Sequence, residues 1–286
     1  MDSGLRRNER WGVSPNDGMC GFRRNNDRLR TITATRYVTP LREGGSLPAI
    51  VEADDAGMYV LKFRGAGQGP KALIAELVAG GVARALGLPI PEIVFVELDV
   101  ALARAEPDPE IQDLIKASAG LNLGLDYLPG SVTFDPVVEH PDAELASSIV
   151  WFDALVTNVD RTPRNANLLM WHRKLWLIDH GAALYFHHAW DDYLTRSVAP
   201  FALIREHVLL PAASKLADVD ASLAAKLDER TIDAIVEDIP AAWLAGDAPF
   251  ADHRAHREAY AAWLKRRLAS PRAFVEEAIR ARARDL

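Results

Sequence analysis

The chain has 286 residues, 49% of them hydrophobic and 26% charged, which suits a globular protein of one large domain or two lobes. Its formal net charge of −7 argues against a general nucleic-acid or anionic-membrane binder. A single cysteine, Cys20, excludes an intrachain disulfide and a cysteine zinc site, and suits a reducing compartment. No apolar stretch approaches the ~20 residues that span a bilayer, and the N-terminus lacks the apolar segment of a signal peptide. We therefore expect a cytoplasmic protein.

The first thirty residues are polar, rich in arginine and asparagine, and lack a sustained apolar period. A segment of this composition buries too little apolar surface to fold by itself. We expect residues 1–30 to be a disordered tail. A basic arm that binds a partner is the alternative interpretation.

A hairpin is predicted directly after this tail. Thr31–Val38 and Leu47–Glu52 have the composition of strands and flank a turn at Gly44, Gly45 and Ser46. The turn lacks a full Gly-x-Gly-x-x-Gly pattern, so it is weak as a phosphate-binding motif by itself.

The third predicted strand, Met58–Arg64, carries a lysine in an apolar setting. Strand alternation places Val60 and Lys62 on one face, and Tyr59, Leu61 and Phe63 on the other. Lysine is rarely buried without a partner. Lys62 therefore either pairs with a carboxylate or lies on an exposed edge strand.

The helix expected over Lys71–Leu86 begins after Pro70 and ends before Gly87. Glu76 is its only acidic residue, and the positions three and four away hold alanine, leucine and glycine. A carboxylate on such an apolar stripe needs a cation, and Lys62 is the candidate. A surface glutamate on a helix that packs by another face is the alternative.

Further elements follow in chain order. We expect strands at Pro91–Leu98 and Leu121–Leu128, and a short helix or irregular insert at Pro107–Ala117. From His140 the pattern is helical and apolar nearly all round, as in the buried central helix of a larger lobe. Helices are also expected over four later ranges: Leu216–Leu227, Thr231–Val236, Asp252–Leu268 and Pro271–Arg284, the last with Ser270 as its cap.

Two groups of histidines could suggest metal sites. The segment Ala182–Leu210 contains paired histidines and paired aspartates, and the helix Asp252–Leu268 contains His253 and His256. In neither group does the spacing of the side chains suit a shared metal ion. We therefore expect the first segment to be a solvated loop and the histidines of the helix to lie on a solvated face. Thr195 or Ser197 in the first segment is a hypothetical autophosphorylation site.

The stretch Trp151–Leu184 carries the chemistry. Its polar loop contains Asp160 and, five positions later, Asn165; a hairpin of two short apolar runs, Leu168–Trp171 and Leu175–Ile178, then ends on Asp179. Phosphoryl transfer needs a carboxylate near the attacking hydroxyl and oxygen ligands for magnesium. One rigid unit supplies all of these groups.

This order and spacing resemble the catalytic core of the protein-kinase-like superfamily. The sequences Asn-Val-Asp-Arg, Arg-Asn-Ala-Asn-Leu-Leu and Ile-Asp-His-Gly are most similar to those of HipA-type kinases and the related phosphoinositide kinases. The resemblance implies an α+β, two-lobed protein-kinase-like fold, with an antiparallel sheet plus one helix in the small lobe and a mostly helical large lobe. It also implies ATP and Mg²⁺ as ligands.

The resemblance assigns roles to particular residues. Asp160 would be catalytic, and Asn165 and Asp179 would bind metal, with Asn167 a poorer candidate. The ATP-binding set would be Lys62, Glu76, Val60, Gly44, Gly45, Ser46, Asp126, Tyr127 and Leu128. The last three belong to Leu-Asp-Tyr-Leu-Pro-Gly, which is similar to the hinge of aminoglycoside- and choline-kinase relatives.

The implied organisation is a small lobe over 31–125, a hinge at 126–130 and a large lobe over 131–286, with a catalytic loop at 158–168 and a metal-binding turn at 179–181. The expected acceptor is a serine or threonine of a protein. A small-molecule or lipid kinase, a catalytically inactive nucleotide-binding regulator and a toxin–antitoxin interaction module are the alternatives. An antitoxin-like regulator is a possible partner, and no direct contact with nucleic acid or membrane is expected.

Overall fold

A five-stranded barrel forms the first part of the protein. The structure, a computed structural model, describes residues 29–41, 47–246, 249–269 and 271–284. The predicted glycine turn at 44–46, the cap at Ser270 and nearly all of the tail at 1–30 lie outside these residues. The barrel strands are β1 (Thr31–Pro40), β2 (Ala49–Ala53), β3 (Met58–Lys62), β4 (Ile93–Leu98) and β5 (Gly120–Asp126).

The barrel closes through one parallel strand pair, which the sequence analysis did not predict. The strands lie in the order β1-β2-β3-β5-β4, and Thr31–Thr33 of β1 pairs with Phe95–Glu97 of β4. All other neighbours in the barrel are antiparallel. The antiparallel sheet that was expected is therefore a closed barrel with one parallel pair. Because β1 and β4 are distant in sequence, no local pattern specifies their pairing.

Alternate side chains of the strands point inward and fill the barrel. Tyr59 and Leu61 of β3 are buried, together with Phe63 just beyond the strand, while Val60 and Lys62 are half-buried on the other face. The predicted division of the two faces is confirmed. Buried residues of β1, β2 and β4 join this first set in one apolar core.

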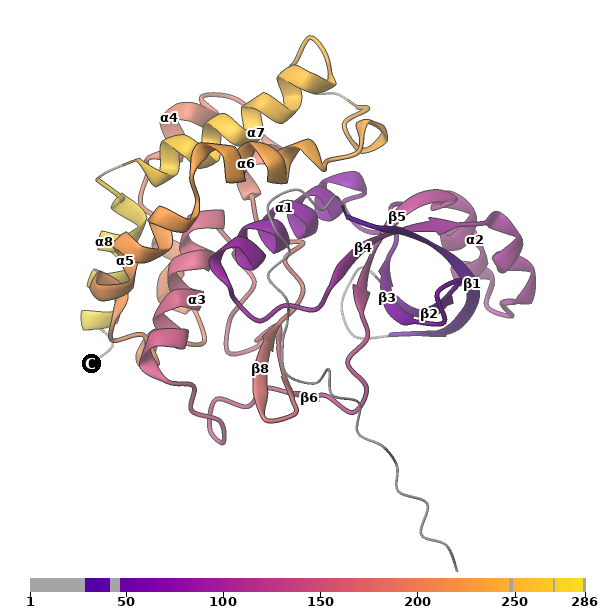
Figure 1. Cartoon of the computed structure of the whole chain (residues 1–286), viewed down its shortest axis with the longest axis horizontal. Coiled ribbons are helices and arrows are strands. Elements are labelled where there is room, and N and C mark those ends of the chain that lie inside the picture. Colours follow the sequence, from indigo (N-terminus) through magenta and orange to yellow (C-terminus); the bar gives the residue numbers. More distant parts are fainter. Residues whose placement is uncertain (1–28, 42–46, 247–248, 270, 285–286) are drawn as a thin grey trace, which may run out of the picture.

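Besides the one helix that the kinase resemblance implied, the small lobe contains a second α-helix, where a short helix or irregular insert was predicted at Pro107–Ala117. Helix α1 (Pro70–Leu86) begins at a proline and ends at Gly87, whose φ of 81° is the left-handed conformation that glycine adopts easily. A 3₁₀ helix, η1 (Val100–Ala105), and helix α2 (Pro109–Ala117) follow β4. Figure 1 shows α2 beside the barrel and α1 between the barrel and the later helices.

The central helix of the larger part is α3 (Ala143–Val156), and it is buried on nearly every side, as predicted. Asp142 caps its start by accepting the backbone N–H groups of Glu144 and Leu145. Strands before and after α3 form a three-stranded sheet in the order β6-β7-β8: β6 (Val132–Thr133), β7 (Leu168–Trp171) and β8 (Lys174–Leu177). The hairpin β7–β8 is the predicted one, and β6 was not predicted.

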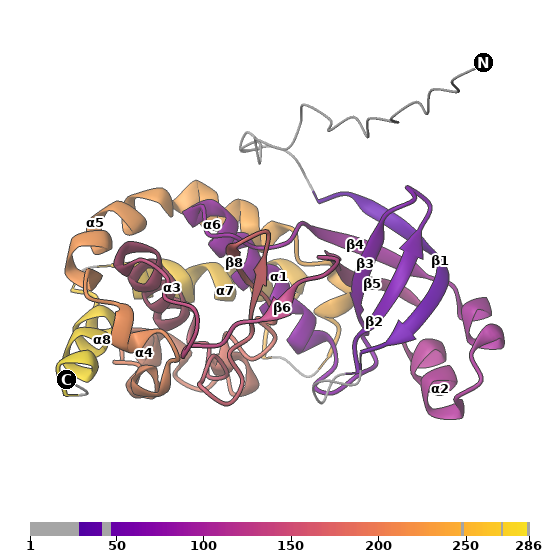
Figure 2. The same cartoon turned by 90° about the horizontal axis from the view of Figure 1, so that it is seen from below.

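Helices form the rest of the chain, at the end of the molecule opposite the barrel (Figure 2). The 3₁₀ helices are η2 (Tyr185–His188), η3 (Ala202–Glu206), η4 (Leu210–Ala212) and η5 (Ala241–Trp243). The α-helices are α4 (Tyr193–Ser197), α5 (Leu216–Lys226), α6 (Glu229–Glu237), α7 (His253–Leu268) and α8 (Ala273–Arg284). In the described part of the chain, no helix is both long enough and apolar enough to span a membrane.

Gly124 provides a test of the barrel packing. It lies opposite Val94 across β4 and β5, and a Cβ atom at this position would be 2.6 Å from Cγ2 of Val96. Valine is stiff at χ1, so we expect Gly124→Ala to lower the free energy of unfolding by about 1–3 kcal/mol. Urea denaturation measures this change. For Gly246→Ala, whose Cβ would meet no described atom within 4 Å, we expect a change within about 0.5 kcal/mol; equal midpoints for both variants would contradict the tight contact.

Candidate active site

Three elements meet at the ammonium group of Lys62. Lys62 ends β3, Glu76 lies in the middle of α1, and Asp179 follows β8. Nζ of Lys62 is 2.8 Å from Oε2 of Glu76 and 2.5 Å from Oδ1 of Asp179. The structure therefore brings the expected Lys62–Glu76 pair together and adds Asp179 to it.

Burial and charge compete at this cluster. The Glu76 side chain is fully buried, that of Lys62 is 12% exposed and that of Asp179 is 42% exposed. Burial alone lowers the pKa of Lys62, but the charges of Glu76 and Asp179 outweigh it and raise that pKa above its usual value. Burial alone raises the pKa of Glu76, but the charge of Lys62 and a hydrogen bond from His180 hold it below its usual value. Lys62 and Glu76 are therefore both charged at neutral pH. Of the three side chains, only that of Asp179 is open to solvent to a substantial extent.

The loop after α3 holds Asp160 among amide groups. Nδ2 of Asn165 donates to Oδ2 of Asp160 at 2.8 Å, and Nδ2 of Asn167 lies 3.3 Å from the same oxygen. Reciprocal backbone hydrogen bonds between Thr162 and Asn165 close the loop into a tight turn. Asp160, Asn165 and Asn167 therefore form one polar group.

A buried ion pair fastens this loop to α3. Nε of Arg161 is 2.6 Å from Oδ2 of Asp153, and both side chains are fully buried. Nη1 of Arg161 donates to the backbone carbonyls of Asn167 and Ile178, the latter at 3.4 Å. One guanidinium thus connects the residue after Asp160 to the residue before Asp179.

Asp153 also accepts a hydrogen bond from a histidine that is distant in the sequence. Nε2 of His207 lies 2.9 Å from Oδ2 of Asp153, and Nδ1 of His207 accepts the backbone N–H of Leu209. The second bond fixes the proton on Nε2, which donates to the carboxylate. Burial alone raises the pKa of Asp153, but the charge of Arg161 and the bond from His207 hold it below its usual value.

Asp153 and His207 had no predicted role. Asp153 is a carboxylate within a helix that is otherwise apolar nearly all round, and this was a usable signal because a buried carboxylate needs a cation. His207 lies 54 positions away, and no sequence pattern pointed to it.

The expected hinge residues lie at the end of β5. The backbone N–H of Asp126 donates to the carbonyl of Glu92, and that of Tyr127 donates to the carbonyl of Met58. Both N–H groups therefore already donate hydrogen bonds to carbonyls of the small lobe. Burial and the nearby charge of Glu92 raise the pKa of Asp126. Leu128 is buried, and Val60 is half-buried on the same face as Lys62.

The segment after Asp179 is less solvated than we expected. His187 is fully buried, and its Nδ1 lies 3.1 Å from the hydroxyl of Tyr260 on α7. His256 is also buried, and its ring stacks on that of Tyr260, with ring centroids 5.5 Å apart. The predicted solvated loop and solvated helix face are wrong at these positions, because aromatic rings cover both histidines. Ser197 is fully buried as well, whereas Thr195 is exposed.

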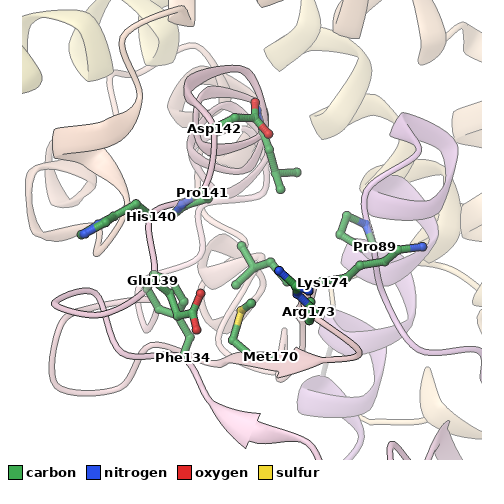
Figure 3. Close-up of a pocket in the computed structure, with 11 residues that line it drawn as sticks. Pro89, Phe134, Glu139, His140, Pro141, Asp142, Met170, Arg173 and Lys174 are labelled. Atoms are coloured by element: carbon green, nitrogen blue, oxygen red, sulfur yellow. The ribbon is translucent and has the colours of Figure 1, made fainter.

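A cavity of about 380 Å³ lies away from these groups. It is bounded by the loop before α3, by the β7–β8 hairpin and by the loop after α1, and Figure 3 shows Arg173 and Lys174 beside Pro89, with Glu139 near Met170. Lys62, Glu76, Asp160, Asn165 and Asp179 do not line it. The cavity is therefore separate from the charged groups described above.

Comparison with solved structures identifies the class of fold. The crystal structure of the Helicobacter pylori proinflammatory kinase CtkA aligns with a TM-score of 0.50 and 13% identity, over 90% of this chain and 99% of that chain. The Golgi casein kinase, in a structure with Mn and ADP bound, aligns with a TM-score of 0.49 and 12% identity, over 90% of this chain and 75% of that chain. A comparison of the sequence with curated proteins gave no match. The likeness to CtkA shows a kinase-like fold.

The family follows from the sequence itself. The model of the HipA-like kinase family matches residues 35–274, so this chain belongs to the HipA-like kinases. The resemblance inferred from the Asp160 loop and the Asp179 turn is confirmed. The protein is an ATP-dependent kinase.

Removing the charge of Asp153 tests the buried network. Asp153→Asn leaves Arg161 buried without a counter-charge, so we expect the free energy of unfolding to fall by about 3–5 kcal/mol. Arg161→Lys keeps the positive charge but removes the guanidinium that donates to several acceptors at once. We expect it to lower the free energy of unfolding by a smaller amount, about 1–3 kcal/mol. Urea denaturation measures both changes. Asp218→Asn alters an exposed aspartate of α5 and is the control; a loss no larger than that of the control would contradict the network.

The buried histidines predict acid sensitivity. Burial lowers the pKa of His187 and of His207, in the latter against the opposing effect of Asp153. The unfolded chain binds these protons near the usual pKa of 6.5, and the folded chain binds them only at lower pH. The stability is therefore fully present above about pH 6.5 and is lost as the pH falls, by up to about 1.4 kcal/mol per pH unit for each histidine.

Urea denaturation between pH 7.5 and 5 measures this slope and stays above the range where most carboxylates titrate. We expect His207→Gln, which keeps an N–H near Nε2, to have a shallower slope than the wild type. Identical slopes would contradict a neutral His207 in the folded state.

Proposed function

We propose that this HipA-like kinase transfers the γ-phosphate of Mg²⁺-bound ATP to serine or threonine residues of a protein. The observation that carries this proposal is the Lys62–Glu76–Asp179 cluster, which Arg161 connects to the Asp160 loop. The cluster combines a cation, Lys62, that the buried Glu76 holds in place with a solvent-accessible carboxylate, Asp179. Phosphoryl transfer depends mainly on such positioning and charge compensation.

The cluster is suited to an anionic ligand with a metal. Lys62 and Asp179 form an ion pair with each other. With ligands bound, a phosphate would take the place of Asp179 beside Lys62, and a divalent cation would take the place of Lys62 beside Asp179. Carboxylate and amide oxygens are the ligands that Mg²⁺ prefers, and Asp179 and Asn165 provide them. The bound cation would neutralise charge on the phosphates. Lys62 would bind phosphate oxygens, and Glu76 would hold Lys62 in place.

Asp160 would act on the acceptor. The oxygen of the acceptor hydroxyl forms a bond to the γ-phosphorus, the bond from that phosphorus to the β,γ-bridging oxygen breaks, and ADP leaves. Asp160 accepts or orients the hydroxyl proton. Asn165 and Asn167 already donate to Oδ2 of Asp160 and would fix its direction.

Exposed apolar side chains favour a polypeptide acceptor. Tyr185 is 60% exposed, Val198 46% and Leu203 45%, and all three lie on the segment that follows the Asp179 turn. Exposed apolar side chains on this segment would supply contacts for a polypeptide. This feature supports a protein acceptor over a small polar molecule.

Transfer from γ-labelled ATP tests the proposal. The assay compares the wild type, Asp160→Asn and Asp179→Ala, with a bacterial lysate as acceptor and with Mg²⁺ present or chelated. We expect Asp160→Asn to lower the rate about 10²–10⁴-fold and Asp179→Ala to abolish Mg²⁺-dependent transfer. Asp218→Asn, on the exposed surface of α5, is the matched control and should keep the wild-type rate.

Acid hydrolysis of the labelled protein then identifies the modified residue. Phosphoserine or phosphothreonine is the expected product. Label that appears only in small molecules or lipids would instead favour the alternative acceptors. ATP binding without any transfer by the wild type would favour an inactive nucleotide-binding regulator.

A further inference from the structure

His180 lies between the expected metal ligand Asp179 and Gly181, and the roles described above do not use it. Its side chain is 1% exposed. A buried imidazole in the turn that presents a metal ligand is either a filler of apolar space or a connection to another element. Its hydrogen bonds separate these two possibilities.

His180 contacts both oxygens of the Glu76 carboxylate. Its backbone N–H donates to Oε2 at 2.8 Å, the same oxygen that receives Lys62. Its ring Nδ1 lies 3.1 Å from Oε1. Within the described part of the chain, the ring of His180 is the partner of Oε1, so the imidazole completes the coordination of a fully buried carboxylate.

The position of the ring proton follows from its partner. A carboxylate without a proton only accepts hydrogen bonds, and its partners keep Glu76 in that form. Nδ1 of His180 therefore carries the proton. Nε2 has no hydrogen-bond partner among the described residues, and the ring meets Phe152 of α3 edge-on at 5.6 Å. The imidazole thus connects α1 to α3 through one polar and one apolar contact.

Asp179, which precedes His180, has a backbone conformation that neighbouring hydrogen bonds must stabilise. Asp179 has a φ of 54°, a left-handed conformation that costs free energy for a residue other than glycine. On one side, Ile178 donates to the carbonyl of Asn167 at 3.1 Å and accepts from Arg161 at 3.4 Å. On the other side, Glu76 holds both the backbone and the ring of His180. The conformation of Asp179 is therefore held from both neighbours.

We propose that His180 is a positioning residue that ties the metal-binding turn to α1, so that Asp179 is presented to metal only while Glu76 is in place. The inference rests on the proposed function, because it takes Asp179 as a metal ligand. Glu76 then acts on both charged groups of the site, on Lys62 directly and on Asp179 through His180. A displacement of α1 would disturb the phosphate-binding cation and the metal-binding carboxylate together.

A matched pair of substitutions tests the hydrogen bond apart from the packing. His180→Asn places an amide N–H near the position of Nδ1, within reach of Oε1 of Glu76. His180→Gln places the same group near the position of Nε2, where the described structure offers no partner. Both variants bury an amide in place of a ring. His180→Phe keeps the ring and its contact with Phe152 but removes the bond.

The first readout is the affinity for Mg²⁺ in the presence of a non-hydrolysable ATP analogue, measured by calorimetry. Changes to a group that orients a metal ligand typically cost about 10–100-fold in metal affinity or activity. We expect losses of this size for His180→Gln and His180→Phe, with His180→Asn close to the wild type. In turnover assays the loss should fall on kcat and on the Mg²⁺ requirement more than on the KM for ATP. Equal affinity in all three variants, or a His180→Phe variant that matches the wild type, would overturn the inference.

The second readout, hydrogen exchange of the nucleotide-free protein, does not depend on catalysis. If His180 ties the two elements, residues 70–80 of α1 and residues 177–184 should both exchange faster in His180→Phe than in His180→Asn. Equal protection in both variants would overturn the tie even in an active enzyme. A wild type that shows the tie but neither binds nor uses Mg²⁺ and ATP would overturn the proposed function instead.

Discussion

The ion pair between Asp153 and Arg161 is the interaction on which the site depends. Arg161 follows Asp160 directly, so the contacts that hold its guanidinium also hold the Asp160 loop. A buried charge is tolerated only if it is paired and hydrogen-bonded. Nε of Arg161 pairs with Asp153, and Nη1 donates to the carbonyls of Asn167 in the Asp160 loop and of Ile178 before Asp179, while Nη2 has no partner among the described residues. The bonds that hold the buried arginine therefore also position both acidic groups of the site.

Two separate polar networks converge on the Asp179 turn. The Arg161 network belongs to α3 and the Asp160 loop, and the Glu76 network belongs to α1 and β3. The first holds Ile178, directly before Asp179, and the second holds His180, directly after it. The small and large lobes are connected at this point by hydrogen bonds as well as by apolar packing. His207 extends the first network to the end of the segment that follows the turn.

Much of the site was predictable because its signals are local. A lysine in an apolar strand, a glutamate on an apolar helix stripe and the Asp160–Asn165 spacing each break a pattern over a few residues, and burial rules turn each break into a requirement for a partner. The start and end of α1 were equally clear from Pro70 and Gly87. These features depend on propensity and spacing, which a sequence displays directly.

Other features depended on contacts between distant segments. The pairing of β1 with β4, the bond from His207 to Asp153 and the cover of Tyr260 over His187 each join residues that are far apart in sequence. Histidine is polar enough to be expected at the surface and apolar enough to be buried once an aromatic ring covers it. The composition of the segment after Asp179 therefore gave the wrong expectation for His187.

The closed barrel limits how other proteins can bind to the small lobe. An open sheet presents an edge of free backbone groups, and many peptides bind by adding a strand to such an edge. In the described strands, β2, β3 and β5 have neighbours on both sides, whereas β1 pairs with β4 through Thr31–Thr33 and with β2 through Ala34–Pro40. Over the doubly paired strands a partner would therefore have to recognise this lobe through side chains, on the outer surface of the barrel or on α2. Specificity in such a contact would depend on the residues displayed there, since those strands offer no main-chain ladder to support binding.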